Sequence, residues 1–314
     1  MAELNWSDAQ WQKVKDAVND AFNKASVASA FLPMYGPLPG NAETVRNEQL
    51  RQDDTSTPPT IRLDGDYPEV NLKLVNLTAK VELSSEQIAD ETLSNALLVF
   101  RRAASILAQE EDRIVFEGLR QRPQAEDSKF VANDRVEPLP GLADLPKRQL
   151  FSGLDRDGGK SIGQAVVSAI VDATQSLEDN FNPGPFACVL GSDLFTEVHD
   201  PSQSLVLPAD RIAPLLKGGP LLRSTSMNPK VGVVVSLAGN AVDLVVGTPP
   251  TVQFLQRTDK AKFLFRVYER FTLRIRDTTK PPLAGFRVRA TQNERENEAL
   301  RAELAAAERQ AARQ

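Results

Sequence analysis

Three consecutive carboxylates are the most concentrated chemical groups in this sequence. They are Glu110, Glu111 and Asp112. A pair of iron ions held between helices uses carboxylates together with a Glu-x-x-His spacing, and no histidine stands near these acids. We therefore expect them to form a solvated helix face or to make ion pairs between subunits. An enzyme with carboxylate chemistry on this helix is the alternative.

The other reactive residues are a single histidine and a single cysteine. A zinc site needs several His or Cys ligands, and a Ser-His-Asp triad would have to use His199. The letters FTEVHDPSQS around His199 indicate a helix end that runs into a loop, so we expect a surface histidine. Cys188 lies in the apolar run FACVLGSD and is expected to be a small buried side chain. A lone cysteine excludes an internal disulfide and fits a reducing cytoplasm.

A glycine-rich segment, GLDRDGGKSIG at residues 153–163, resembles a phosphate-binding loop. The G-x-x-x-x-G-K-S pattern requires glycine where Leu154 stands. We interpret the segment as a polar turn, after which Ser161 caps a helix with Gln164 as its capping-box partner. No catalytic residue, metal or cofactor is therefore expected.

Composition narrows the class of protein further. The 314 residues are 41% hydrophobic and 25% charged, with a net charge of −5. No apolar run approaches the roughly 18 residues needed to cross a bilayer, and the first residues lack the pattern of a secretory signal. A negative chain disfavours binding to nucleic acid. We expect a cytoplasmic protein with neither a nucleic acid nor a membrane as a partner.

The elements around the carboxylates are long. A helix is predicted over residues 91–117, about 40 Å long at 1.5 Å per residue, ending at Gly118. Its apolar stripe, which Glu111 interrupts, consists of Leu93, Leu97, Phe100, Ala104, Leu107 and Ile114. A first helix is predicted over residues 7–26, with Ser7 and Gln10 as a capping box. Long helices with one apolar side are more typical of a protein that forms a wall than of a protein built around a binding pocket.

Strands and a polar segment accompany these helices. Residues 69–83 alternate with a slip near Val75, which predicts a β-bulge or a bend. Residues 262–276 are the clearest strand in the sequence, with Arg266, Arg270 and Arg274 opposite the apolar face. Residues 41–66 have too few apolar side chains for a core. They are either a disordered loop or, as we prefer, a two-stranded arm that gains order on a neighbour.

The second half of the chain alternates helices and short strands, which indicates an α+β lobe. A helix is expected from Ser161 to Leu177, and Ser192 and Pro208 are expected to start two others. Strands are predicted at 187–191, 231–237 and 241–247. Residues 290–314, rich in Ala, Glu and Arg, are expected to be an exposed helical tail.

Several of these segments, taken in order, resemble the encapsulin shell proteins, a linocin-like family related to the major capsid proteins of tailed phages. The segments are FLPMYGPLP, AQEEDRIVFEG, GPFACVLGSDLF, the strand pair VGVVVSL and VDLVVG, and FLFRVYERFTLRI. The resemblance covers roughly residues 5–287. It implies an α+β fold with a spine-helix P-domain, a compact A-domain and an extended E-loop.

The resemblance also implies where the parts lie. The expected limits are a lumenal helix at 1–30, a P-domain at 31–39, 71–140 and 251–289, an E-loop at 40–70, an A-domain at 141–250 and the tail at 290–314. The E-loop would contact other copies, with Arg51, Thr60 and Arg62 as candidates. A five-fold pore would be formed by the loop with His199, Asp200, Pro201, Ser202 and Gln203.

The function implied by the resemblance is a closed icosahedral shell made of many copies. Family shells enclose a cargo enzyme, often a peroxidase or a ferritin-like iron protein, that is held by a C-terminal targeting peptide. The candidates for docking cargo are Trp11, Val14, Val18 and Phe22, and the alternative is that they only pack their helix onto its own domain. Some relatives bind a flavin beside a tryptophan near the start of the spine helix. The segment KVELSSEQIADET has none, so no flavin is expected.

A phage or prophage major capsid protein is the second hypothesis. It would share the fold. Such proteins commonly carry an N-terminal scaffolding region, whereas the first helix here is expected at residue 7, which favours the cargo shell.

Overall fold

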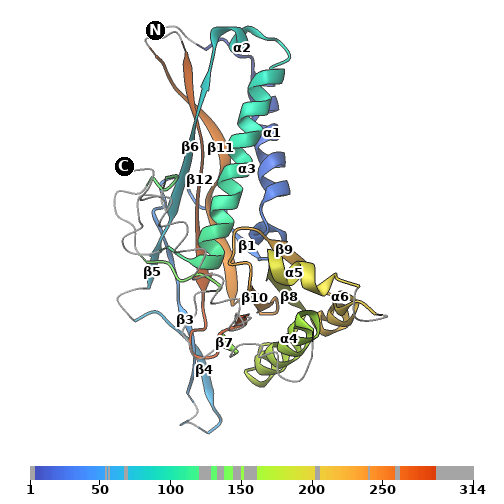
Figure 1. The fold of residues 1–314 in the computed structure, drawn as a ribbon. Helices are drawn as coiled ribbons and strands as arrows, with labels where there is room; N and C mark the ends of the chain where they lie inside the picture. Colours follow the sequence, from blue (N-terminus) through green and yellow to red (C-terminus); the bar gives the residue numbers. More distant parts are fainter. Residues whose placement is uncertain are drawn as a thin grey trace, which may run out of the picture.

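The computed structural model describes residues 4–53, 55, 57–66, 70–119, 129–132, 138–143, 150–151, 161–201, 206–239, 241–258 and 262–287. Figure 1 shows three parts: a long lobe in which two helices lie along a sheet, a second lobe of sheet and helices at its base, and a narrow hairpin that extends beyond both. The mixed fold matches the expected α+β class.

The long lobe is built on a four-stranded sheet in the order β1-β11-β12-β6. Its strands are β1 (Met34–Tyr35), β6 (Val75–Leu83), β11 (Val242–Arg257) and β12 (Phe263–Ile275). β12 runs antiparallel to both of its neighbours, and β1 is parallel to β11. The predicted slip near Val75 is confirmed. β5 (Asn71–Lys73) ends just before Leu74 and pairs with the strand at Thr44–Arg46, whereas β6 begins at Val75 and pairs with β12.

Two long helices cover one face of this sheet. α1 (Asp8–Ala25) begins with the predicted capping box, since Ser7 Oγ accepts from Gln10 N and the Gln10 side chain accepts from Ser7 N. The predicted helix 91–117 is α3 (Ser94–Glu117), which begins three residues later than expected, and a separate short helix, α2 (Ser85–Ala89), precedes it. The extended backbone of Asp90 (φ −67°, ψ 110°) ends α2, and Leu93, with a left-handed backbone (φ 56°), is the N-cap of α3. Gly118, which follows α3, has φ 77°, as glycine tolerates.

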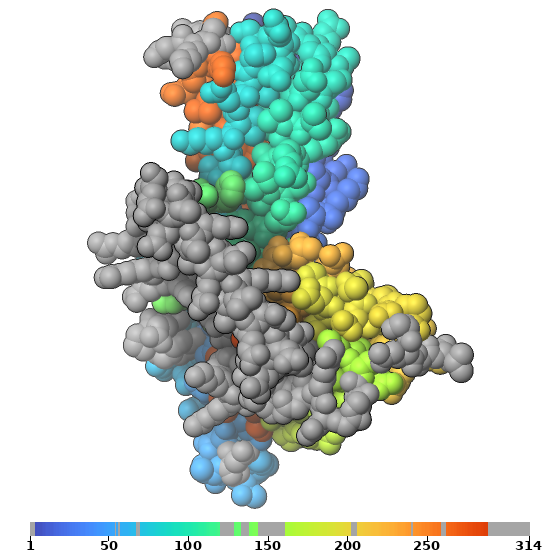
Figure 2. All heavy atoms as spheres, viewed as in Figure 1, coloured from blue at the N-terminus to red at the C-terminus, as the bar shows by residue number. Residues whose placement is uncertain are grey.

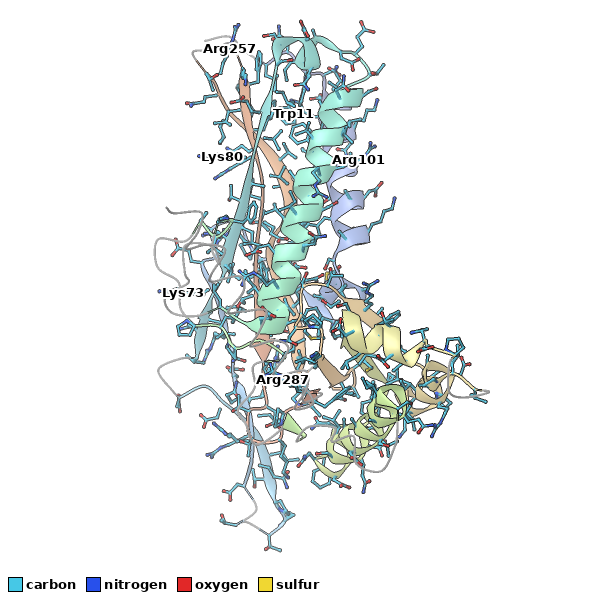
Figure 3. All side chains as sticks on the ribbon, viewed as in Figure 1. Trp11, Lys73, Lys80, Arg101, Arg257 and Arg287 are labelled. Atoms are coloured by element: carbon cyan, nitrogen blue, oxygen red, sulfur yellow. The ribbon has the colours of Figure 1, made fainter. Side chains whose placement is uncertain are left out.

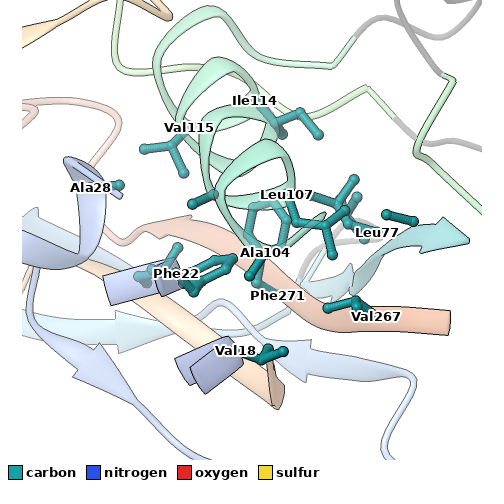
Figure 4. Close-up of a cluster of buried hydrophobic side chains, with 14 of the residues drawn as sticks. Val18, Phe22, Ala28, Leu77, Ala104, Leu107, Ile114, Val115, Val267 and Phe271 are labelled. Atoms are coloured by element: carbon teal, nitrogen blue, oxygen red, sulfur yellow. The ribbon is translucent and has the colours of Figure 1, made fainter. Parts of the chain in front are cut away.

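The core of the long lobe lies between these helices and the sheet. Figure 4 shows Phe22 of α1 beside Phe271 of β12, with Leu107 of α3 close to Leu77 of β6. All four side chains are buried. Trp6 precedes α1, stacks on Phe265 with ring centroids 5.2 Å apart, and donates to the Ile88 carbonyl at 3.2 Å. The N-terminal segment is therefore part of the core.

The second lobe contains a five-stranded sheet in the order β7-β13-β10-β8-β9. These strands are β7 (Leu150–Phe151), β8 (Phe186–Gly191), β9 (Leu221–Ser224), β10 (Val231–Ser236) and β13 (Leu283–Arg287). The helices are α4 (Ile162–Asp179), α5 (Ser192–Val198), α6 (Pro208–Ile212) and η2 (Ala213–Leu216). Val233 of β10 joins the core of the long lobe, and Val234 faces α4 in a second core.

Several local predictions for this lobe are tested by the structure. Cys188 is buried as expected, Ser161 caps α4, and Pro208 opens α6. Ser192 does not cap α5. Gly191 occupies the cap position and Ser192 is the first helical residue, because the glycine needs no side chain where Asn228 and Pro229 carbonyls approach it.

The sheets divide the chain differently from the expected domain limits. β10 and β11 follow each other in sequence, yet they belong to different sheets. β11 begins at Val242 in the sheet of the long lobe, whereas the A-domain was expected to continue to residue 250. β13, expected in the P-domain, pairs with β10 in the second lobe.

The arm consists of two small antiparallel pairs. β2 (Thr44–Arg46) pairs with β5, and β3 (Gln49–Asp53) pairs with β4 (Thr60–Asp64). Figure 2 shows the β3–β4 end protruding from the rest of the subunit. Among the described residues, no helix is long and apolar enough to span a membrane.

Candidate functional site

The β3–β4 hairpin presents two different faces. Leu50 stands opposite Leu63, and Gln52 opposite Ile61, so one face is largely apolar. Its side chains are exposed: 36% for Leu50, 52% for Leu63 and 68% for Ile61. An apolar strand face left in water is typical of a surface that another chain covers.

The opposite hairpin face carries the three predicted contact residues. Arg51 stands directly opposite Arg62, and Thr60 stands opposite Asp53. Arg51 also donates to Thr279 Oγ1 of its own subunit at 2.7 Å. The structure thus brings the three candidates onto one exposed face, and it adds the apolar face, which we did not single out from the sequence.

The candidates for docking cargo on α1 are mostly inaccessible. Val14 and Val18 are fully buried and Phe22 is 3% exposed. Trp11 is partly buried, 5.2 Å from the Trp6 ring, and Figure 3 shows it beside α3. Val14, Val18 and Phe22 therefore pack α1 onto its own core, which is the alternative weighed for them, because a residue without exposed surface cannot contact a second protein.

The exposed side of α1 is polar. It carries Asp8, Gln12, Lys13, Lys15, Asp16, Asp20, Asn23 and Lys24. Lys13 Nζ donates to the Thr92 carbonyl at 2.8 Å and so ties the helix to the start of α3. The rest of this polar side is the part of α1 that a docked protein can reach.

The predicted pore residues lie at one end of α5. His199 is at the C-terminus of that helix, where its ring stacks on Phe195 with centroids 4.3 Å apart. His199 Nδ1 is 2.8 Å from the Phe195 carbonyl. Asp200 and Pro201 follow and are exposed, as is His199. Ser202 and Gln203 lie outside the described residues.

The carboxylates of α3 are not a solvated face, which corrects the sequence-based expectation. Glu110 is paired with Arg113 on its own helix. Glu111 and Asp112 are 3% and 2% exposed. They are buried because both receive hydrogen bonds from the turn after α1: Ser26 Oγ donates to Glu111 Oε1 at 2.9 Å, and Ala28 N donates to Asp112 Oδ1 at 2.8 Å.

A third buried carboxylate lies close to these two and was missed from the sequence. Glu269 of β12 is 2% exposed, and its Oε1 has no hydrogen-bond partner. Burial, together with the charges of Glu111 and Asp112, holds the pKa of Glu269 well above its usual range. Its place in β12, between Val267 and Phe271 on the apolar face, was the available signal.

Burial also changes the acidity of the other two. It raises the pKa of Glu111 to about 8, with a further contribution from the charge of Asp112. Burial raises the pKa of Asp112 to about 6, against the opposing effect of backbone N–H groups. Asp112, with the lower pKa of these two, therefore ionises before Glu111 as the pH rises, and its carboxylate accepts the backbone N–H donors.

Chemistry elsewhere in the described residues is limited. Within the ranges given above, no group of three or more His, Cys, Asp or Glu side chains is arranged to hold a metal ion. Cys188 is fully buried, which raises the pKa of its thiol far above the usual range and makes the thiolate inaccessible.

Comparison with known proteins places the chain in a family. The model of the Linocin_M18 family, described as "Encapsulating protein for peroxidase", matches residues 3–124 and 139–272. The type 1 encapsulin shell protein EncA of Myxococcus xanthus is 24% identical over 287 residues, covering 88% of this chain and 92% of that protein. A diheme-cytochrome-encapsulin shell fusion protein of Kuenenia stuttgartiensis is 23% identical, covering 88% and 72%.

Solved structures share the fold. The virus-like particle from Pyrococcus furiosus has a TM-score of 0.61 at 15% identity, with 88% of this chain and 98% of that chain covered. The capsid of Myoviridae phage XM1 has a TM-score of 0.52 at 16% identity, covering 82% and 88%. At these identities the likeness concerns the capsid-like fold alone. The family match, which spans most of the sequence, shows that this chain belongs to the Linocin_M18 family and is an encapsulin shell protein.

Proposed function

We propose that copies of this subunit close into the shell by clasping one another with their arms, residues 40–70. The observation that supports this is the hairpin's exposed apolar face at Leu50, Ile61 and Leu63. Among the described residues, this face belongs to none of the buried apolar clusters. A second copy that covers it removes apolar area from water, and repeated contacts of this kind close a symmetric assembly.

The test is a truncation that removes the outer part of the β3–β4 hairpin and keeps the residues that join the hairpin to the rest of the subunit. Residues 51–62 are replaced by Asn-Gly, which suits a tight turn between the paired residues Leu50 and Leu63. We expect soluble, folded subunits that do not form closed particles in electron microscopy. Closed particles of normal diameter from this variant would contradict the clasping role.

The shell encloses cargo, and we propose that the cargo is a peroxidase or a ferritin-like protein carrying a C-terminal targeting peptide. The family description, an encapsulating protein for peroxidase, supports the first class. The shell itself would do no chemistry, and the nanocompartment would lie in the cytoplasm. Mass spectrometry of the proteins that co-purify with native particles identifies the cargo. Catalytic turnover by pure empty shells would contradict the proposal that the shell does no chemistry.

Docking would use the polar exposed side of α1 together with Trp11, because Val14, Val18 and Phe22 are buried. Lys15 and Lys24 are exposed cations on this helix. We expect Lys15→Glu with Lys24→Glu to lower the amount of cargo per particle while particle number and diameter stay unchanged. An unchanged amount of cargo would place docking on a different element.

The end of α5 would line a pore where several copies meet. His199, Asp200 and Pro201 are exposed there, and a ring of Asp200 carboxylates would favour cations. We expect Asp200→Lys to slow the entry of ferrous ions into closed particles without changing their diameter. Equal entry rates for the two proteins would rule out this position for the pore.

A further inference from the structure

The arm leaves the subunit through a root with little apolar packing. Val45, Leu74 and Val245 form the buried cluster there, with Leu38 and Leu72 packed against it. The β3–β4 hairpin lies beyond this cluster and is largely exposed. Apolar packing of the described residues therefore gives the hairpin little support, and polar contacts at the root fix its direction.

Two arginines on one face of β12 supply such contacts. Arg270 donates to the Gly40 carbonyl at 3.0 Å and to the Ala42 carbonyl. Arg274 donates from Nη1 to the Arg46 carbonyl at 3.1 Å. The arginines are four residues apart, about 13 Å along a strand, and the carbonyls of residues 42 and 46 are also four residues apart. The segment from Ala42 to Arg46, at the start of the arm, is thus held alongside β12 by two contacts with the same spacing on both segments.

Arg274 is itself held rigidly. It is 4% exposed, and its guanidinium donates to both carboxylate oxygens of Asp243, at 2.8 Å and 2.6 Å. The Tyr35 ring lies over it, with its centroid 4.5 Å from the guanidinium carbon. Lysine cannot reproduce this arrangement, because an ammonium group lacks the planar fork that binds a carboxylate and a carbonyl together.

The contacts continue where β12 ends. Gln49 Nε2 donates to the Ile275 carbonyl at 2.9 Å, and Leu50 N donates to the Arg276 carbonyl at 2.6 Å. Gln49 is 5% exposed, although it stands at the start of the exposed hairpin. Between Gly40 and Leu50 the chain is therefore held to β12 and the residue after it at several points, while its β2 part also pairs with β5.

We propose that Arg270 and Arg274 are positioning residues for the arm: they set the angle at which it leaves the sheet and so the geometry of the contact between copies. This rests on the clasping role proposed above. Without the two guanidinium groups, the arm keeps its apolar face but leaves the sheet in a range of directions. Copies then join at variable angles, which prevents a uniform closed shell.

Arg270→Met in the full-length chain tests this, because methionine retains much of the apolar stem and removes both carbonyl contacts. We expect peptides covering residues 44–50 to exchange their amide hydrogens about tenfold faster. Electron microscopy should show particles of mixed diameter and unclosed fragments. If Arg270→Met is insoluble, Arg270→Lys provides the same readouts, since one ammonium group replaces a fork that reaches two carbonyls.

Arg266→Met is the matched control. Arg266 lies four residues before Arg270 on the same face of β12, and it donates to Gln253 of the neighbouring strand at 2.8 Å. We expect its particles and its arm exchange to match the wild type. Arg274→Lys should resemble Arg270→Met in both measurements. Normal exchange and a single normal diameter in both Arg270→Met and Arg274→Lys would overturn the proposal.

The truncation of residues 51–62 separates this proposal from the one it rests on. If the truncated chain forms normal particles, clasping by the arm fails. If the truncation blocks closure while Arg270→Met and Arg274→Lys close normally, clasping stands and positioning by the arginines fails.

Discussion

Asp112 of α3 accepts hydrogen bonds from the backbone N–H groups of Val27 and Ala28, at 2.8–3.0 Å. These N–H groups belong to the turn in which α1 ends and the short helix η1 (Ala28–Ala30) begins. A carboxylate on one long helix therefore fixes the end of the other. The junction joins the two helices that cover the sheet.

Asp112→Asn should weaken this junction. The asparagine amide has one acceptor oxygen and no charge. The buried N–H groups of Val27 and Ala28 therefore lose part of the hydrogen bonding that the Asp112 carboxylate provides. We expect a loss of about 1–3 kcal/mol in the free energy of unfolding, seen as a lower melting temperature of the particles. Asp20→Asn on the exposed side of α1 is the control and should change the melting temperature little.

The neighbouring carboxylates predict a dependence of stability on pH. The folded protein holds a proton on Glu111 up to pH about 8, whereas the usual pKa is 4.5. Between these values the folded state binds more protons than the unfolded state, so stability falls as the pH rises. The same sign holds for Glu269, whose pKa is also raised by burial.

Glu111→Gln and Glu269→Gln remove these titrations while keeping the shape of each side chain. Glu111→Gln should gain stability over the wild type as the pH rises from 4.5 towards 8, by up to ~1.4 kcal/mol per pH unit. Glu269→Gln should gain stability with the same sign as the pH rises above 4.5. Melting temperatures measured across that range test this. A flat difference for both core variants across that range would contradict the prediction.

Burial of Glu111 follows from the sequence pattern, whereas burial of Asp112 does not. Glu111 lies four residues after Leu107 and three before Ile114, which places it on the apolar stripe of the helix. The pattern therefore indicated that the Glu111 side chain is buried, and our expectation of a solvated face was wrong. Asp112 is buried because the turn at Val27 meets α3, and that contact joins residues more than 80 positions apart.

The length of β11 shows a second limit of sequence reasoning. A strand was predicted at 241–247, yet β11 continues past the adjacent Pro249 and Pro250 to Arg257, although proline rarely stands inside a sheet. The strand tolerates them because its pairing with β12 shifts register between Thr248 and Thr251. Its pairing with β1 is confined to Leu244 and Val245. The prolines thus stand where the ladder is interrupted.

Phe22→Ala should reduce the stability of the subunit. Its ring is 3% exposed between α1 and the sheet, and truncation of such a ring costs about 3–5 kcal/mol. We expect a lower melting temperature and an unchanged ratio of cargo to shell in the particles that do form. Lys15→Ala on the exposed side of α1 should leave the melting temperature unchanged, and a lower cargo ratio for Phe22→Ala would restore this residue as a docking contact.

The two faces of the hairpin should differ in their effect on assembly. Ile61→Ser with Leu63→Ser removes two exposed apolar side chains, whose burial between copies the clasping proposal requires. Arg62→Gln changes the opposite face, where the like charge of Arg51 stands directly across the ladder. We expect the double variant to yield folded subunits that remain unassembled at concentrations where the wild type and Arg62→Gln form particles. Light scattering against concentration measures this. A critical concentration raised by Arg62→Gln but not by the double variant would place the contact on the charged face.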